Sequence, residues 1–106
     1  MREHLDGACN RAYYAMFDAA RAALLASGAG VAPEIAKTHS GLISAFRLHL
    51  VKTGRVPIEL GKTLNKAEEL RLIADYKGDP VEEASASWVV SEAHTFVQVM
   101  RDTFLS

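Results

Sequence analysis

The sequence predicts an all-α domain, folded as an antiparallel bundle that resembles a four-helix bundle. Apolar residues recur at steps of three and four positions through most of the 106 residues, which is the spacing of one helix face. Residues with high helix propensity dominate, and runs of β-branched residues are few. The length, with no internal repeat or long linker, indicates a single domain over residues 1–106.

A first helix is predicted from near Arg2 to Ser27, because Gly28 and Gly30 follow the last apolar position and favour a helix end. Its expected inner face is rich in alanine, which permits a close neighbouring helix. The residues of this face are Leu5, Ala8, Ala12, Met16, Ala19, Ala20, Ala23 and Leu24.

A second helix is predicted to start at Thr38 or His39, after a connecting segment that contains Pro33. We expect it to end at residues 52–54, where Lys52 favours the carbonyl pole and Gly54 favours a stop. Its expected inward residues are Leu42, Ile43, Phe46 and Leu50.

The third helix is predicted from Pro57 to about Asp75. In the fourth helix, Asp79 is the expected cap, Pro80 suits the first position, and Glu82 completes the capping pattern. The expected inward residues are Leu60, Leu64, Ala67, Leu70 and Ala74 in the third helix, and Val81, Ala84, Trp88, Val89, Ala93, Phe96, Met100 and Phe104 in the fourth.

The charges nearly balance, with 12 Lys and Arg against 13 Asp and Glu and a formal net charge of -1. This balance argues against a protein that coats nucleic acid through bulk charge, so a nucleic-acid contact would need a local basic patch. The single cysteine, Cys9, excludes an internal disulfide and a zinc site of four thiolates, which suits a reducing cytoplasm. Polar residues interrupt the alanine-rich segment 12–25, so it is not a membrane span. We therefore expect a cytoplasmic protein without membrane contact.

The first candidate site is the motif Asn10-Arg11-Ala12-Tyr13-Tyr14. At helical spacing it brings an amide, a guanidinium and two phenols to neighbouring positions, a set suited to holding a base or a phosphate. In the alternative interpretation, the tyrosines are core residues whose hydroxyls reach the surface, and Arg11 pairs with Asp18. The two interpretations are compatible.

The second candidate site is formed by Arg71, Asp75 and Tyr76. Arg71 and Asp75 lie four positions apart, but arginine before acid is the weaker order and stabilises a helix by only a few tenths of a kcal/mol. Ligand binding therefore explains the presence of Arg71 and Asp75 better than helix stability does. The Tyr76 phenol is placed to form a hydrogen bond with an acid or with a ligand phosphate. In the alternative interpretation, these residues have no role in binding and lie on a helix face that is exposed to solvent.

A third group gathers Lys37 and His39 with two hydroxyls at a predicted helix start, where free amides attract anions. The alternative is that Thr38 or Ser40 caps the helix and His39 forms a hydrogen bond across the bundle. The other histidines show no spacing to acids that predicts a metal site, and no cofactor is expected. They are His4, His49 and His94.

With these residues in view, the chain resembles the HEPN domain, the higher eukaryote and prokaryote nucleotide-binding family, in its small stand-alone branch from bacteria and archaea. The resemblance covers nearly the whole chain and is carried by motifs in the family's order. They are Asn10-Arg11-Ala12-Tyr13-Tyr14-Ala15-Met16-Phe17, Lys37-Thr38-His39-Ser40-Gly41-Leu42, Lys52-Thr53-Gly54 and residues 71–76.

This resemblance implies a helical bundle, a homodimer, and a polar cleft at or near the dimer interface. It also implies a partner, because many members are encoded beside a minimal nucleotidyltransferase, in a toxin and antitoxin pair whose HEPN protein is commonly the toxin. Relatives normally carry a further helix before the first motif, whereas Met1 lies nine residues ahead of Asn10. We therefore expect part or all of that helix to be missing and its place to be filled by a second copy.

One departure bears on catalysis. Active HEPN ribonucleases resemble one another in an arginine followed four to six residues later by a histidine, and in this chain Arg71 is followed five positions on by Tyr76. A tyrosine of ordinary pKa, about 10, is a poor general base at neutral pH. The resemblance thus implies binding more directly than cleavage, although His39 could act with Arg71 from another helix.

The leading hypothesis is a protein that binds a nucleotide or RNA in a polar cleft. Arg71 would neutralise phosphate and Asp75 would orient Arg71. The other ligand-binding candidates are Asn10, Arg11, Tyr13, Tyr14, Lys37 and Tyr76, with His39 beside Arg71 as a candidate catalytic residue. Two alternatives stay open: a metal-independent endoribonuclease toxin with a variant active site, and a non-catalytic bundle that docks a partner protein.

Overall fold

A computed structural model describes the backbone of residues 2–73 and 82–105, and the side chains of these ranges from residue 7 onward. The described residues are largely helical and form no strand. The helices are α1 (Arg2–Ala26), α2 (Pro33–Lys37), α3 (His39–Phe46), α4 (Ile58–Leu72) and α5 (Glu83–Met100). A π-helical turn follows α3 as η1 (Arg47–Val51), and another follows α5 as η3 (Arg101–Leu105). The predicted all-α bundle is confirmed.

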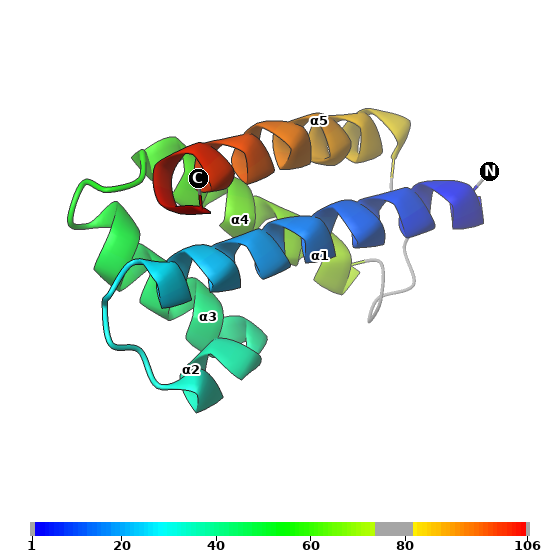
Figure 1. Ribbon diagram of the computed structural model, residues 1–106. Coiled ribbons are helices and arrows are strands. Elements are labelled where there is room, and N and C mark those ends of the chain that lie inside the picture. The colour runs from blue at the N-terminus through cyan, green and yellow to red at the C-terminus, as the bar shows by residue number, and fades with distance from the viewer. Residues whose placement is uncertain (1, 74–81, 106) are drawn as a thin grey trace.

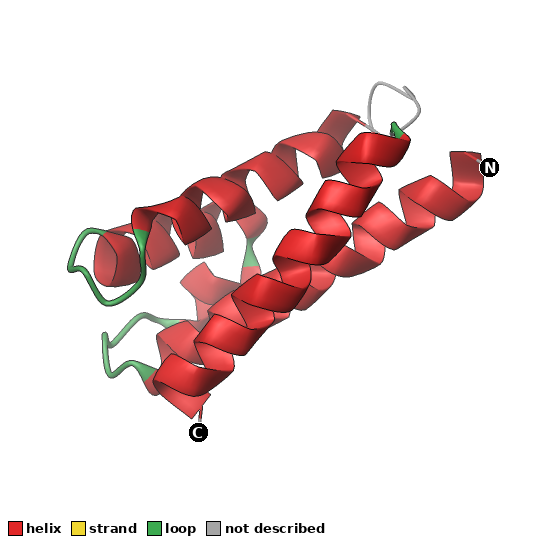
Figure 2. Ribbon diagram, turned by 90° about the horizontal axis from the view of Figure 1, so that it is seen from above, coloured by secondary structure: helices red, strands yellow, loops and turns green. Residues whose placement is uncertain are grey.

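Helices α1 and α5 lie side by side over much of their length and run in the same direction (Figures 1 and 2). Helix α4 runs the opposite way beside them. Short α2 reverses the chain after α1, so that α3 also runs in the direction of α1 (Figure 1). This topology brings the start of α3 and the end of α4 together beside the first half of α1.

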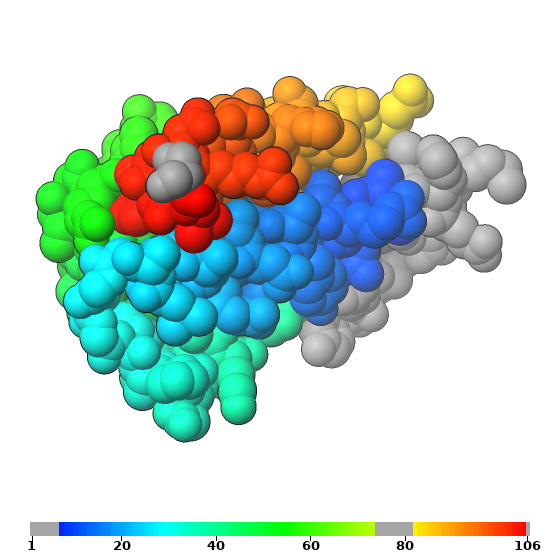
Figure 3. All heavy atoms as spheres, viewed as in Figure 1, coloured from blue at the N-terminus to red at the C-terminus, as the bar shows by residue number. Residues whose placement is uncertain are grey.

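The core is formed where the inner faces of all the long helices meet. Its largest fully buried side chains include Tyr13, Phe46, Phe96 and Met100. Small residues of α1 that are fully buried, such as Ala20 and Ala23, allow close packing, as the sequence predicts. In the space-filling view, α1 lies between α5 and the α2 segment (Figure 3). None of the described helices combines the length and apolarity needed to cross a membrane.

Most of the predicted elements match the structure. Helix α1 ends one residue before the predicted Ser27, and α3 starts at His39 with Thr38 as its cap. The Thr38 hydroxyl accepts a hydrogen bond from the Gly41 amide at 3.0 Å. The helical segment from His39 continues through η1 to Val51, and Gly54 follows with a φ of 80°, a conformation that favours glycine.

Two predictions for helix boundaries are wrong. Pro33 does not lie in a connecting loop, because it opens α2, a helix of only 5 residues that is too short to show a periodic pattern. Helix α5 begins at Glu83, and Glu82 is extended at its cap position, so Glu82 cannot occupy the third helical position of a capping box. Asp79 and Pro80 lie outside the described residues.

The predicted inner face of α5 is right from Val89 onward and wrong at Ala84 and Trp88, while Val81 lies outside the described residues. Ala84 is exposed and Trp88 is 38 % exposed, whereas Ala86 is buried. Ala84, Trp88 and Leu70 line a depression at the surface, so the beginning of α5 lies at the edge of the bundle.

Candidate functional site

Four polar side chains from three helices meet at one end of the bundle and are here called the polar cluster: Tyr13 of α1, His39 of α3, and Glu68 and Arg71 of α4. The Tyr13 hydroxyl lies 2.9 Å from Nδ1 of His39, and Oε2 of Glu68 lies 3.4 Å from the same nitrogen. Nη2 of Arg71 donates to Oε1 of Glu68 at 3.2 Å. Glu68 therefore joins the histidine to the arginine.

Local sequence places each member of the cluster. Thr38 caps α3, which makes His39 the first residue of that helix and directs it toward α1 and α4. Glu68 and Arg71 are three positions apart on α4 and therefore share a face. Tyr13 lies on the inner side of α1 and is fully buried, so its hydroxyl is one of the few polar atoms in the core.

Aromatic rings surround the imidazole of His39. The ring centroid of Phe17 lies 4.7 Å from it, and those of Tyr13 and Tyr14 lie 5.6 and 5.7 Å away. Contacts on several sides restrict the rotation of the imidazole. The polar contacts at Nδ1 then leave Nε2 as the ring nitrogen suited to meeting a ligand.

The ion pair of the cluster is largely shielded from water. The side chain of Arg71 is 11 % exposed and that of Glu68 is 18 % exposed. The guanidinium carbon of Arg71 also lies 5.3 Å from the centre of the Tyr13 ring. Low exposure strengthens the interaction of this guanidinium with any anion that enters the site.

The other three members of the polar cluster, Tyr13, Glu68 and Arg71, have shifted pKa values. Burial, reinforced by the Glu68 carboxylate, raises the pKa of Tyr13 far above its usual 10.0. Burial disfavours the charge of Glu68, but hydrogen bonds from Tyr13 and Arg71 outweigh it and lower the pKa of Glu68 below 4.5. Burial likewise opposes the charge of Arg71, yet the Glu68 carboxylate raises the pKa of Arg71. At neutral pH the cluster therefore holds a neutral phenol, a carboxylate and a guanidinium.

The structure brings together predicted residues from separate motifs. Tyr13, His39 and Arg71 belong to the cluster, and Tyr14 lies against it, 39 % exposed. Tyr13 is a core residue, as the alternative interpretation predicts, and it is also a member of the cluster. The role of the tyrosines in holding a base or a phosphate stays a prediction. Asp75 and Tyr76 lie outside the described residues.

Other predicted residues lie on the surface around the cluster and not in it. Asn10 and Arg11 are exposed on α1, where the Arg11 guanidinium lies close to Gly7. Lys37 is exposed at the end of α2. Asp18 pairs with Arg21 at 3.4 Å, so the predicted pairing of Asp18 with Arg11 is not the one formed.

Glu68 is the residue that sequence reasoning missed. Among the described residues it is the acid that contacts Arg71. Asp75, for which the sequence suggested this role, lies outside them. The spacing of three positions between Glu68 and Arg71 could have indicated that the two side chains pair. However, the neighbouring Glu69 is equally acidic, and in the structure Glu69 pairs at the surface with Lys66 at 3.9 Å. Only the packing of α4 against α1 tells the two acids apart.

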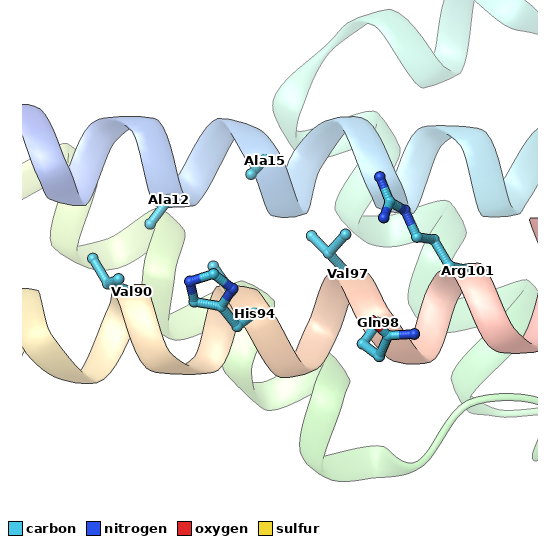
Figure 4. Close-up of a pocket in the computed structure, with 8 residues that line it drawn as sticks. Ala12, Ala15, Val90, His94, Val97, Gln98 and Arg101 are labelled. Carbon is cyan, nitrogen blue, oxygen red and sulfur yellow. The ribbon is translucent and has the colours of Figure 1, made fainter.

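A hollow lies between α1 and α5, on the flank of α1 that faces away from the polar cluster. It has a volume of about 370 Å³. Figure 4 shows Ala12 and Ala15 facing Val90 and Val97 across it, with Arg101 at one end. Its lining is mainly small and apolar. Among the described residues, no group of three His, Cys, Asp or Glu side chains is placed to hold a metal ion.

The model of the HEPN domain matches residues 1–103 of this chain. A UPF0332 protein of Gloeobacter violaceus is 40% identical over 96 residues, which are 89% of this chain and 72% of that protein. A UPF0332 protein of Thermotoga maritima is 45% identical over 80 residues, 76% of this chain and 56% of that protein.

A protein of Methanocaldococcus jannaschii, named as a candidate toxin, is 37% identical over 87 residues, 82% of this chain and 61% of that protein. The chain thus spans less than two thirds of the Thermotoga protein and of this Methanocaldococcus protein. No solved structure matches the chain.

Proposed function

Because the chain belongs to the HEPN domain family, we propose that it binds a nucleotide or RNA at the polar cluster and serves as the toxin-like member of a pair with a nucleotidyltransferase. The observation that carries the proposal is the shielded Arg71 guanidinium, fixed by Glu68 beside the imidazole of His39. Relatives named as candidate toxins support the toxin-like role.

The chemistry of the cluster suits a phosphate ligand. A guanidinium presents planar N–H donors that match phosphate oxygens, and its attraction to an anion increases where water is scarce. Glu68 holds Arg71 in one orientation, which lowers the cost of ordering it when the ligand binds. Tyr14, 39 % exposed beside the cluster, offers a ring on which a base can stack.

A second candidate function, cleavage of RNA, is favoured by the placement of His39. Its imidazole enters the cluster from α3 and shares Glu68 with Arg71, although the two residues are far apart in the sequence. In this scheme Nε2 of His39 takes the proton of the ribose 2′-hydroxyl while Arg71 binds the scissile phosphate. Tyr13 cannot serve as the base at neutral pH, because burial raises its pKa.

Assembly is part of the proposal. We infer that two copies of the chain form a homodimer and that a nucleotidyltransferase is its partner. Analytical ultracentrifugation of the purified protein tests the first inference, and co-purification with a co-expressed minimal nucleotidyltransferase tests the second.

The deciding experiment measures binding of ATP and of short single-stranded RNA to the wild type, Arg71→Ala and His39→Ala, with RNA integrity followed in the same samples. We expect Arg71→Ala to weaken binding roughly 10- to 100-fold, the size of a lost charge-assisted hydrogen bond. Arg101→Ala, which removes a cation from the α1–α5 hollow, is the matched control and should bind as the wild type does.

The outcomes separate the candidates. Cleavage lost in His39→Ala while RNA binding persists selects the ribonuclease. Binding without cleavage in every variant selects the non-catalytic nucleotide or RNA-binding protein. Failure of the wild type to bind either ligand overturns both and leaves the protein-docking bundle.

A further inference from the structure

We propose that the groove between α3 and α4 holds the sugar-phosphate backbone next to the nucleotide at the polar cluster, so that the ligand is a single-stranded oligonucleotide rather than a free nucleotide. The inference rests on the proposed function and names its ligand class. It is carried by two adjoining cavities whose linings place two exposed cations, Arg47 and Lys62, with hydroxyl and amide groups among apolar side chains.

The groove begins at the polar cluster and follows both helices away from it. One cavity of about 300 Å³ is lined by Ser40 and Ser44 of α3, Arg47 of η1, and Asn65 and Glu68 of α4. A second cavity, also of about 300 Å³, shares Arg47 and Asn65 and continues to Lys62 and Ile58. Because Glu68 belongs to both the groove and the cluster, a ligand at Arg71 has a direct path into the groove.

The side chains of the groove match a nucleic-acid backbone. Arg47 and Lys62 supply one cation from each wall, and both are exposed. Ser44 and Asn65 add a hydroxyl and an amide for phosphate or ribose oxygens. Glu68 is the acid among the lining residues and is paired with Arg71, so the two lining cations, Arg47 and Lys62, outnumber it.

The spacing of residues explains why the groove is continuous. Ser40, Ser44 and Arg47 follow one another at steps of four and three, so they share one face of the α3 and η1 segment. At the far end, a Cβ on Gly61 would lie 3.1 Å from Cγ2 of Val51. Glycine there lets α4 approach η1 closely and closes the floor of the groove.

The length of the groove exceeds one nucleotide. From Ile58 to Glu68 the axis of α4 advances about 15 Å at about 1.5 Å per residue. Stacked nucleotides advance about 3.4 Å each along a strand, so the groove accommodates about four. A single nucleotide at Arg71 would leave Arg47 and Lys62 unused.

The test compares AMP with oligoadenylates of increasing length, by fluorescence anisotropy over a range of salt concentrations. We expect affinity to rise with length until the groove is filled. Arg47→Ser and Lys62→Ser should each weaken oligonucleotide binding about fivefold to tenfold. Each should also reduce the slope of the logarithm of the binding constant against the logarithm of the salt concentration by about 1, as expected for a lost phosphate contact. AMP binding should be unchanged in both variants.

The matched controls are Lys66→Ser on α4 and Arg101→Ser on η3, which remove exposed cations outside the groove. If they weaken oligonucleotide binding as much as Arg47→Ser and Lys62→Ser do, bulk charge explains the effect and the inference is overturned. Unchanged oligonucleotide binding in the groove variants, with a loss in Arg71→Ala, overturns the inference but supports the proposed function. No binding of AMP or RNA by the wild type overturns both.

Discussion

The two flanks of α1 carry opposite kinds of surface. Toward α3 and α4, α1 presents Tyr13 to a shielded ion pair between Glu68 and Arg71. Toward α5 it presents Ala12 and Ala15 to a hollow lined mainly by small and apolar side chains. Keeping charges partly buried is costly unless each is paired, whereas alanines only allow close packing. The polar flank is therefore the one whose arrangement demands a functional explanation.

The largest effect is expected from Glu68→Ala, which removes the Glu68 carboxylate from the shielded guanidinium of Arg71. Breaking a buried pair in this way should lower the free energy of unfolding by about 3 kcal/mol. Urea denaturation measures the change. Glu69→Ala is the matched control, because the exposed pair of Glu69 and Lys66 contributes at most about 1 kcal/mol. Equal losses in the two variants would remove the distinction between the cluster and an ordinary helix surface.

A smaller loss is expected from Tyr13→Phe, which keeps the ring and removes the hydroxyl. The lost hydrogen bond should cost about 1 kcal/mol at neutral pH. Because the folded protein raises the pKa of Tyr13, its stabilising effect is complete below the usual pKa of 10.0 and declines as the pH rises above it. Thermal unfolding should therefore show a weaker alkaline destabilisation in Tyr13→Phe than in the wild type. An unchanged alkaline profile would contradict the raised pKa.

Acid should weaken the polar flank through Glu68. Its pKa is lowered in the folded state, so its contribution is present above 4.5, the usual value, and is lost as the pH falls through the lower folded value. Glu68→Gln, which cannot titrate, should lose less stability than the wild type between neutral pH and pH values below 4.5. Urea denaturation followed by circular dichroism at each pH measures the stability. If the stability of both proteins falls equally with decreasing pH, the pKa of Glu68 is not lowered in the folded state.

The smallest effect is expected from Ala15→Leu in the α1–α5 hollow. Ala15 is exposed, and the hollow has room for a larger side chain, so stability should change by no more than about 0.5 kcal/mol. RNA binding should be unaffected, because this flank lies apart from the polar cluster. Lost RNA binding in a folded Ala15→Leu protein would move the site to the apolar flank.

Much of the architecture could be predicted from local patterns. The end of α1 near Gly28 and the start of α3 at His39 follow from a helix stop and from a cap, both of which act within a few residues. Helix α2 could not be found in this way, because 5 residues show no periodicity. The exposure of Trp88 was also missed, since it depends on which side chains of other helices pack beside α5.

The long helices, the apolar faces that join them, and three residues of the polar cluster, Tyr13, His39 and Arg71, could be identified from the amino-acid sequence. The packing of the helices brings these residues together and makes Glu68, not Glu69, the acid that joins His39 to Arg71. Caps and helix periodicity are local interactions, whereas the choice between two adjacent acids depends on which one the packing of α1, α3 and α4 shields from water.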